Sequence, residues 1–163
     1  MKIKWLVHAC FLITTDSGIR IVTDPFDETV GYPVPDVEAD IVTSSHDHFD
    51  HNHVQPLRGN FQLINGVGSH YVSDVPITGI KTYHDEVMGK KRGENVVYVF
   101  EADGMRLCHL GDLGHLLDDK TVGEIGPVDI LFIPVGGTYT IDAEEAVKVA
   151  AQHAVHHVGV DVR

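Results

Sequence analysis

Short apolar segments separated by turn signals constrain the fold of this chain more than any other feature of its sequence. The first three such segments cover residues 3–7, 11–14 and 19–22, and an Asp-Ser-Gly turn at residues 16–18 separates the last two. Apolar runs of this length between turn residues are typical of strands and too short for most helices. We therefore expect the chain to begin as an antiparallel meander of three strands.

Further strands are expected farther along the chain, at residues 39–44, 61–65, 77–83, 95–101, 105–110 and 128–134. The clearest hairpin turns at Asp103-Gly104, since this dipeptide readily adopts the positive φ angles of a two-residue turn. Residues 31–35 are expected to form a loop, because their two prolines lack the N–H donor that a strand within a sheet requires.

Helical patterns are fewer than strand patterns. The best one begins at Asp142, whose carboxylate can cap the first turn while Glu145 follows three residues later, and apolar residues continue at helical spacing to about residue 152. Short helices are also expected at residues 54–57 and 116–122. Many strands with few helices indicate an α/β or α+β fold, and the 163 residues suit a single domain with one core.

The charge balance and the cysteines exclude several classes of protein. Asp and Glu number 24 against 12 Lys and Arg, a formal net charge of −12. This balance disfavours a broad surface of clustered cations, on which affinity for long nucleic acids depends. Cys10 and Cys108 are too few for a disulfide framework, and each lies in an apolar run where a buried thiol is expected. No stretch approaches the roughly 20 apolar residues of a membrane span, and we identify no signal peptide or anchor. We therefore expect a protein of the reducing cytoplasm.

The 12 histidines of the chain are clumped rather than scattered, and residues 46–51, which read HDHFDH, hold the densest group. In an extended segment His46, His48 and Asp50 would project to one side, and a turn would bring His51 round to a second point. Two adjacent metal positions thus become available. Imidazole and carboxylate ligands suit zinc, and also manganese, iron or nickel.

The alternative interpretation is that these are surface histidines on a polar loop. A hydrated loop, however, gains nothing from imidazoles and carboxylates at alternating positions directly after an apolar strand. Asp47 points away in the alternating pattern, so we interpret it as a partner that orients an imidazole from behind. His53 lies beyond the pattern and is expected at the surface.

The hexapeptide at residues 46–51 matches the HxHxDH signature of the metallo-β-lactamase superfamily. Four further segments match in order over about residues 1 to 150, namely WLVHACFLI at 5–13, TDPF at 23–26, TYHD at 82–85 and HLGDLGH at 109–115. Together they resemble the ascorbate-6-phosphate-lactonase-like branch of metal-dependent hydrolases in this superfamily. The resemblance implies an αβ/βα sandwich with a dinuclear metal site at one edge.

The resemblance also implies roles for individual residues. It assigns His46, His48 and His84 to one metal, Asp50 and His51 to the second, and Asp112 to a position that bridges the two. His84 follows the expected strand 77–83 and Asp112 follows the expected strand 105–110, so both stand where a rigid sheet can present ligands. From the residues alone, His84 would as readily be a loop histidine and Asp112 an ordinary turn carboxylate.

Four neighbouring residues have weaker assignments. Asp24 follows an apolar strand and precedes a proline; in the family a matching acid supports the metal-binding loop, and otherwise it is a turn carboxylate. His8 lies in an apolar run, where a histidine is most often a satisfied core residue, although its place in a matching motif indicates the edge of the site. His109 and His115 flank Asp112, and alternation could turn His109 toward the pocket.

One element of the superfamily pattern is missing near the C-terminal end of the sequence. In the superfamily a further histidine follows the last helix and the strand after it and completes the second metal position. Here residues 153–163 read HAVHHVGVDVR, and no motif aligns His156 or His157 with that ligand. We expect a polar tail, so that the single domain over residues 1–163 is incomplete or atypical after about residue 152, with a truncated C-terminal part. Such a loss would weaken the second metal position and leave the first.

The resulting hypothesis is a metal-dependent hydrolase that uses two Zn²⁺, with Mn²⁺, Fe²⁺ or Ni²⁺ as alternatives. Two bound cations lower the pKa of water toward about 7 and polarise a carbonyl or phosphoryl oxygen. A metal-bound hydroxide would then attack an ester, lactone or phosphodiester bond. Asp50 would be both a ligand and the catalytic group that orients this nucleophile.

The substrate is expected to be a small, anionic molecule. In this interpretation the loops 27–36 and 84–93 border the pocket, and the second loop carries three cations at residues 90–92, although a solvated basic turn explains them as well. Two rival functions are a metal-binding protein that is catalytically impaired because it lacks the final ligand, and a nuclease of the same superfamily, which the acidic charge disfavours. A homo-oligomer is compatible with the sequence.

Overall fold

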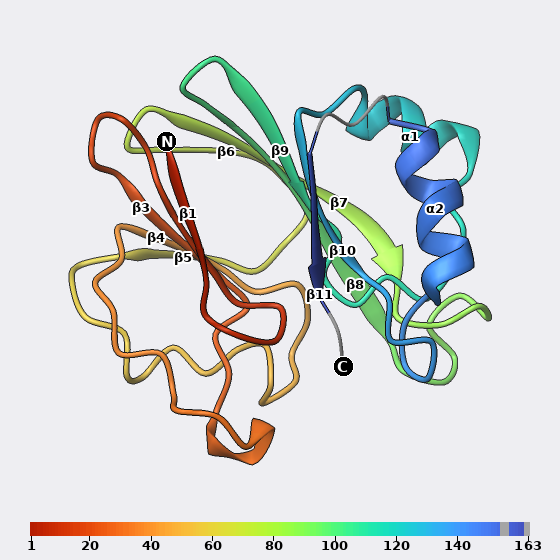
Figure 1. The fold of residues 1–163 in the computed structure, drawn as a ribbon, viewed down its shortest axis with the longest axis horizontal. Coiled ribbons are helices and arrows are strands. Elements are labelled where there is room, and N and C mark those ends of the chain that lie inside the picture. The colour runs from red at the N-terminus through yellow and green to blue at the C-terminus, as the bar shows by residue number, and fades with distance from the viewer. Residues whose placement is uncertain (154–156, 162–163) are drawn as a thin grey trace.

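Two β-sheets packed face to face form the body of the protein (Figure 1). The computed structural model describes residues 1–153 and 157–161. The first sheet contains, in spatial order, β1 (Lys2–Trp5), β2 (Phe11–Thr14), β3 (Arg20–Thr23), β4 (Ile41–Thr43) and β5 (Gln62–Ile64). The strands β1, β2 and β3 form the predicted antiparallel meander, and β3, β4 and β5 are parallel.

The second sheet is larger and has the order β11-β10-β9-β8-β7-β6. Its strands are β6 (Gly68–Val72), β7 (Val75–Tyr83), β8 (Glu94–Ala102), β9 (Met105–His109), β10 (Ile130–Pro134) and β11 (His157–Asp161). The strands β6 to β9 pair antiparallel, whereas β9, β10 and β11 are parallel. The β8–β9 hairpin turns at Asp103 and Gly104, with φ angles of 53° and 71°, which confirms the predicted turn.

Alternation along the central strands builds an apolar layer on each face of the second sheet. Tyr98 and Phe100 of β8 belong to the layer between the two sheets, together with Ile21 of β3. Val97 and Val99 of the same strand belong to the layer under the helices. The period of two in β8 therefore places one central strand in contact with both neighbouring layers.

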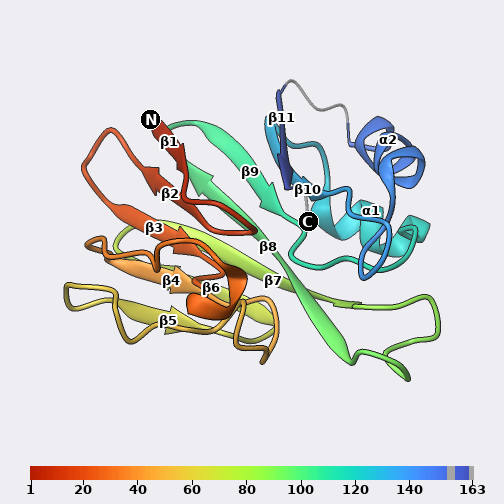
Figure 2. The same ribbon diagram turned by 60° about the horizontal axis from the view of Figure 1, so that its bottom comes forward.

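Two helices cover the outer face of the second sheet, α1 (Asp119–Ile125) and α2 (Ala143–Ala151), and the first sheet lies on the opposite side (Figures 1 and 2). The helix α2 begins where the sequence predicts, because Asp142 accepts the Glu145 N–H at 2.9 Å and the Glu145 side chain accepts the Asp142 N–H at 3.1 Å. The expected helix at 116–122 begins later, as α1, after its N-cap Asp118.

Loops cover the outer face of the first sheet. Phe26, Ala39 and Leu57 pack there against the sheet, and the one-turn 3₁₀ helix η1 (Glu28–Val30) lies in the same segment. The architecture is that of an αβ/βα sandwich in which, over the residues described, the helical layer on this side is reduced to η1. The expected helix at 54–57 is wrong: the segment forms a turn, because Pro56 has no N–H with which to continue a helix.

Two strands were not predicted. The edge strand β6 is mostly exposed and reads Gly-Ser-His-Tyr-Val, so it lacks the apolar alternation that identifies a strand. The expectation of a polar tail is wrong for residues 157–161, which form β11 and pair with β10, His157 opposite Ile130. Val158 and Val160 are β-branched residues two apart, a pattern that favours a strand beside the open edge of β10. His156 lies outside the described residues.

Cys10 and Cys108 are both buried and form no disulfide with each other, which agrees with the sequence prediction. Burial raises the pKa of both thiols. Within the described ranges, neither helix is long and apolar enough to cross a membrane.

The substitution Leu107→Ala tests the layer between the two sheets. Leu107 is fully buried there, so truncation leaves a cavity and should lower the free energy of unfolding by about 2–5 kcal/mol. Urea unfolding followed by circular dichroism measures the change. Val147 in α2 is 69% exposed, so Val147→Ala is the control and should change that free energy by less than about 0.5 kcal/mol. Similar effects of the two substitutions would contradict a core at this layer.

Candidate metal centre

Loops from both sheets bring polar side chains together at one end of the sandwich. The first sheet contributes His8 from the β1–β2 turn, Asp24 directly after β3, and residues 46–51 after β4. The second sheet contributes His84 directly after β7 and Asp112 shortly after β9. The strands are rigid and their ends coincide, so side chains far apart in sequence become neighbours.

Three histidines form one group that could hold a cation. Ligand nitrogens of His46, His48 and His84 lie within 4.8 Å of one another. These are the three residues that the resemblance assigns to one metal, and their role as ligands stays a prediction. His46 Nε2 and His84 Nδ1 are buried and have no hydrogen-bond partner among the described residues. Buried polar atoms are normally satisfied, so the unpartnered Nε2 of His46 fits a role as a ligand of a cation.

The buried carboxylate of Asp112 lies between this group and the rest of the centre. Its Oδ2 is 3.1 Å from His84 Nε2, 3.2 Å from His51 Nε2 and 3.7 Å from His46 Nε2. Two donors bound to one Zn²⁺ at about 2.0–2.1 Å and at the tetrahedral angle are about 3.3–3.4 Å apart. The separations around Asp112 are therefore close to those between ligands of a zinc-sized cation.

Asp24 is the fully buried carboxylate that holds the loop 45–51 in place. Its Oδ1 accepts the Ser45 N–H at 2.8 Å, and its Oδ2 accepts the Ser45 hydroxyl at 2.6 Å and His51 Nδ1 at 2.8 Å. Burial acts to raise the pKa of Asp24, but attraction to His51 and their hydrogen bond outweigh it, so that this pKa is lowered. Because an ionised carboxylate only accepts, His51 carries a proton on Nδ1 and turns Nε2 toward Asp112.

The Ser45 hydroxyl fixes the tautomer of His46 in a similar way. Its hydrogen is donated to Asp24, so its oxygen accepts from His46 Nδ1 at 2.8 Å. The bare nitrogen of His46 is therefore Nε2, the atom near Asp112. Burial, followed by repulsion from His51, lowers the pKa of His46 to about 3, so the ring is neutral at pH 7, as a metal ligand must be.

Asn95 is a residue of the centre that the sequence analysis missed. It is fully buried on β8, where its Oδ1 accepts the Asp112 N–H at 2.9 Å and its Nδ2 donates to Leu110 O at 2.9 Å and Thr82 Oγ1 at 2.8 Å. It thus joins the turn of Asp112 to the end of β7, two residues before His84. The only signal in the sequence was a lone amide in an apolar strand, which a core position also explains.

Asp85 organises the loop that follows His84, a role that the sequence analysis also missed. Its carboxylate accepts four backbone N–H groups at 2.8–2.9 Å, from Val87, Gly89, Lys91 and Arg92. Burial acts to raise its pKa, but these hydrogen bonds lower the pKa to about 2. The loop is therefore held as a defined turn and places Arg92 beside the centre.

Residues 46–51 form a series of turns and not the extended segment that alternation predicted. His46 O accepts the His48 N–H at 3.0 Å, and His48 O accepts the His51 N–H at 2.8 Å. These local hydrogen bonds replace pairing with a neighbouring strand. The loop consequently divides its ligands between two groups, the second of which contains Asp50 and His51.

The interpretation of Asp47 as a partner of an imidazole is wrong. Asp47 is exposed and accepts a hydrogen bond from the Asn52 side chain, because the turns point it away from the centre. His109 does not face the pocket either. It is buried, and its Nε2 donates to Ala9 O at 2.9 Å while its ring packs against Phe11.

The matching segments contain two further histidines, His115 and His8, and these have different surroundings. His115 accepts the Tyr83 N–H on Nε2 at 3.1 Å and so supports the strand end before His84. His8, expected at the edge of the site, lies within it: its Nε2 is 3.3 Å from Asp50 Oδ2, and it shares a group of potential ligands with that residue.

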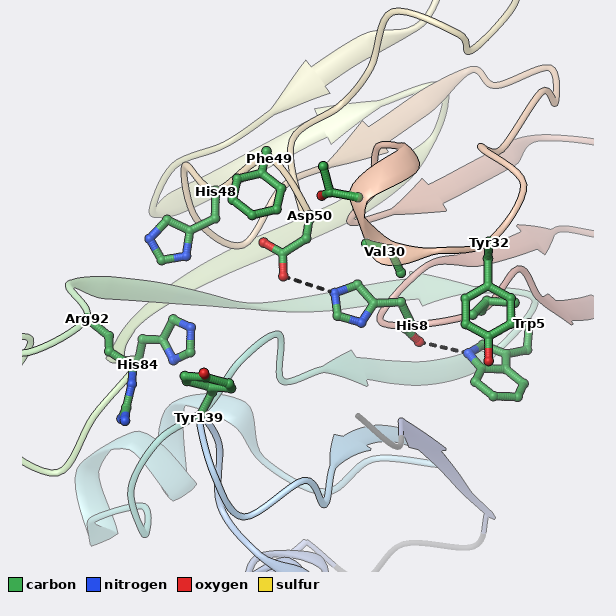
Figure 3. A pocket seen from close by; sticks show the side chains of 12 residues that line it. Trp5, His8, Val30, Tyr32, His48, Phe49, Asp50, His84, Arg92 and Tyr139 are labelled. Atoms are coloured by element: carbon green, nitrogen blue, oxygen red, sulfur yellow. Dashed lines mark hydrogen bonds and ion pairs between the residues drawn. The ribbon is translucent and has the colours of Figure 1, made fainter.

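A cavity of about 760 Å³ opens beside these groups (Figure 3). His48, Asp50 and His84 face it, so a molecule in the cavity could reach the centre. The rest of the wall consists of His8 together with Trp5, Val7, Thr29, Val30, Tyr32, Phe49, Arg92 and Tyr139. The loops 27–36 and 84–93 thus both border the cavity, as the sequence analysis predicted.

This chain is similar to known proteins in sequence and in fold. Residues 2–157 match the family model of the beta-lactamase superfamily domain. The chain is 32% identical to a UPF0173 metal-dependent hydrolase from Carboxydothermus hydrogenoformans, over 91% of this chain and 78% of the relative. It is also similar to the crystal structure of a candidate zinc-dependent hydrolase of the metallo-β-lactamase superfamily from Thermotoga maritima, with a TM-score of 0.83 and 44% identity, over 98% of this chain and 74% of that chain.

A more distant solved structure shares the fold. A candidate metal-dependent hydrolase from Parabacteroides distasonis is 19% identical and has a TM-score of 0.73, over 99% of this chain and 90% of that chain. These similarities confirm the predicted sandwich. The narrower resemblance to the ascorbate-6-phosphate-lactonase-like branch stays a prediction.

The substitution Gly114→Ala tests the contact between the two loops of the second sheet. A Cβ at Gly114 would lie 2.4 Å from both Asp85 N and His84 C, so the backbone must shift, and we expect the free energy of unfolding to fall by about 1–3 kcal/mol. The matched control is Gly123→Ala in α1, where a Cβ meets nothing within 4 Å and should raise that free energy by about 0.4–1 kcal/mol. Chemical denaturation measures both. An unaltered Gly114→Ala variant would show that the contact is loose.

Proposed function

The chain belongs to the beta-lactamase superfamily domain family, and from this premise we propose that it is a metal-dependent hydrolase with two cation positions. His46, His48 and His84 would hold the first cation, Asp50 and His51 the second, and Asp112 both. Bound divalent cations lower the pKa of water toward about 7 and polarise a substrate oxygen. Imidazole and carboxylate donors favour Zn²⁺, and Mn²⁺, Fe²⁺ and Ni²⁺ accept the same donors.

The proposal rests on the position of one buried carboxylate oxygen, that of Asp112. Asp112 Oδ2 has imidazole nitrogens of His46, His51 and His84 around it at 3.1–3.7 Å. Burying such a set costs free energy unless its charges are compensated. Divalent cations held by Asp112 and these imidazoles would compensate the charge of the carboxylate and use the bare Nε2 of His46.

Asp50 differs from Asp112 in its exposure, and this supports a separate role. Its side chain is 20% exposed and faces the cavity, whereas that of Asp112 is 0% exposed. Its Oδ2 lies 3.5 Å from His51 Nε2. Asp50 can therefore take part in the second position and also accept a proton from the attacking water, orienting that water toward a substrate in the cavity.

Arg92 supports an anionic substrate. Its guanidinium lies 5.3 Å above the ring of Tyr139 and donates to Thr138 O at 3.3 Å. No carboxylate among the described residues forms an ion pair with it. Lys91, in contrast, pairs with Glu86. A phosphate or carboxylate group of the substrate would supply the anion that Arg92 lacks at the cavity wall.

The other walls of the cavity support a small substrate with a flat or apolar part. Four aromatic side chains that are 50–60% exposed line it, namely Trp5, Tyr32, Phe49 and Tyr139. Such rings stack on sugars or planar groups. Arg92 is the one Lys or Arg on the described cavity wall, which disfavours a long nucleic acid. The scissile bond would be an ester, a lactone or a phosphodiester.

The substitution His48→Ala should remove a ligand and spare the fold, since His48 is exposed. We expect bound zinc per chain to fall and hydrolysis to drop at least about 100-fold. Elemental analysis gives the first quantity, and a panel of lactones, carboxylic esters and phosphodiesters gives the second. His70→Ala on β6, outside the centre, is the control.

Two outcomes of that experiment oppose the proposal in different ways. Unchanged zinc content in His48→Ala would contradict the ligand assignment. Normal zinc binding by a wild-type protein that hydrolyses none of the panel with added zinc or manganese would favour a metal-binding protein without turnover.

The substitution Arg92→Gln tests the charge of the substrate. Loss of a charge-assisted hydrogen bond of about 1.5–3 kcal/mol should raise KM for an anionic substrate about 10- to 100-fold, while KM for a neutral analogue with the same scissile bond should hardly change. Lys91→Gln is the matched control, because Lys91 pairs with Glu86. Equal changes for the two substrates would argue against an anion at Arg92.

A further inference from the structure

His8 occupies a place in the centre that the sequence pattern did not assign to it. Its ring is buried, with Nε2 3.3 Å from Asp50 Oδ2 and the ring centroid 4.9 Å from that of His51. Ligand atoms of these three residues lie within 4.8 Å of one another. We propose that His8 is a protein ligand of the second cation, beside Asp50 and His51; this inference rests on the function proposed above.

The distances fit a shared cation better than a hydrogen bond. A charge-assisted N–H···O bond is about 2.7–2.9 Å long, and the His8–Asp50 separation of 3.3 Å is longer. Two ligands of one Zn²⁺ are about 3.3–3.4 Å apart, and His51 Nε2 lies 3.5 Å from Asp50 Oδ2 and 3.2 Å from Asp112 Oδ2. The separation between His8 Nε2 and Asp50 Oδ2 therefore matches the separations between the other proposed ligand atoms.

The backbone of the β1–β2 turn is held in an unfavourable conformation that aims the ring of His8. Val7 and His8 have φ angles of 81° and 55°, although neither is glycine. The left-handed region is especially unfavourable for a β-branched residue such as Val7. Strain of this kind persists where the surrounding structure enforces it, and it is concentrated at functional sites.

Hydrogen bonds from the last residues of β1, β3 and β9 fix the turn. The carbonyl of His8 accepts Trp5 Nε1 at 2.8 Å. The next carbonyl, that of Ala9, accepts both Thr23 Oγ1 and His109 Nε2 at 2.9 Å. These contacts set the position of His8 independently of any cation, and they give the buried His109 a role in positioning the turn.

A ligand from the β1–β2 turn would make the two cation positions alike. The first position has three imidazoles and the shared Asp112. With His8, the second has two imidazoles, the Asp50 carboxylate and the same Asp112.

The test is zinc binding by the full chain after removal of metal with a chelator. Zn²⁺ is titrated calorimetrically into the wild type, His8→Ala and His8→Gln, and bound zinc is counted by elemental analysis. The wild type should bind two Zn²⁺ per chain. Both variants should keep one and bind the second at least about 100-fold more weakly. His70→Ala should match the wild type.

The glutamine variant separates a ligand from a hydrogen-bond partner, because its amide can still donate to Asp50 but is a poor zinc ligand. Full binding by His8→Gln with loss only in His8→Ala would overturn the proposal, and so would two tight sites in both variants. A wild type that binds one Zn²⁺ would also overturn it, together with the second cation position, and would leave a metal-dependent hydrolase that uses the first position. A wild type that binds no Zn²⁺ would overturn both this proposal and the proposed function.

A measurement on the wild type covers the case in which the variants do not fold. Histidine ring nitrogens can be followed by ¹⁵N NMR during the zinc titration. The Nε2 resonance of His8 should shift with the second equivalent, after that of His46 has shifted with the first. A His8 resonance that stays unchanged through two bound equivalents would overturn the proposal.

Discussion

The hydrogen bonds that Asp24 accepts from Ser45 and His51 are the interaction on which the centre depends. A buried carboxylate is costly unless donors surround it, and here three donors come from the loop that carries most of the proposed ligands. Because Ser45 passes its hydrogen to Asp24, one carboxylate sets the tautomers of both His46 and His51. Asp24 follows β3 and Ser45 follows β4, and these two apolar strands pair in parallel. The hydrogen bonds of Asp24 therefore depend on the register of this pairing.

Close backbone contact fixes the second half of the centre. A Cβ at Gly111 would lie 2.5 Å from the Ser45 side chain, and Gly111 has a φ of 56°. Glycine is therefore required where the turn of Asp112 meets the loop after β4. Gly114 packs equally closely on the backbone at His84. Asn95 joins the turn of Asp112 to the end of β7 through its amide. The separations between proposed ligands are thus set by the backbone and not by flexible side chains.

The sequence predicted the parts of the fold and centre that depend on local pattern. Apolar runs identified most strands, and residues 46–51 identified the loop of proposed ligands, because these signals lie within a few residues of one another. The polar edge strand β6 and the place of His8 were not predictable in this way. The first has no apolar alternation, and the second depends on a strained turn anchored by His109, about a hundred positions away.

The division of the proposed ligands between the two sheets has a consequence for the mechanics of the whole domain. His46 and His51 belong to the first sheet, and His84 and Asp112 to the second, so a cation held by both would be a non-covalent cross-link between them. Ligands that bind only the folded state stabilise it by about 2.7 kcal/mol at a hundred times their dissociation constant. Here that free energy would act directly against separation of the sheets. The stability of the packing between the two sheets would therefore depend on the concentration of available metal.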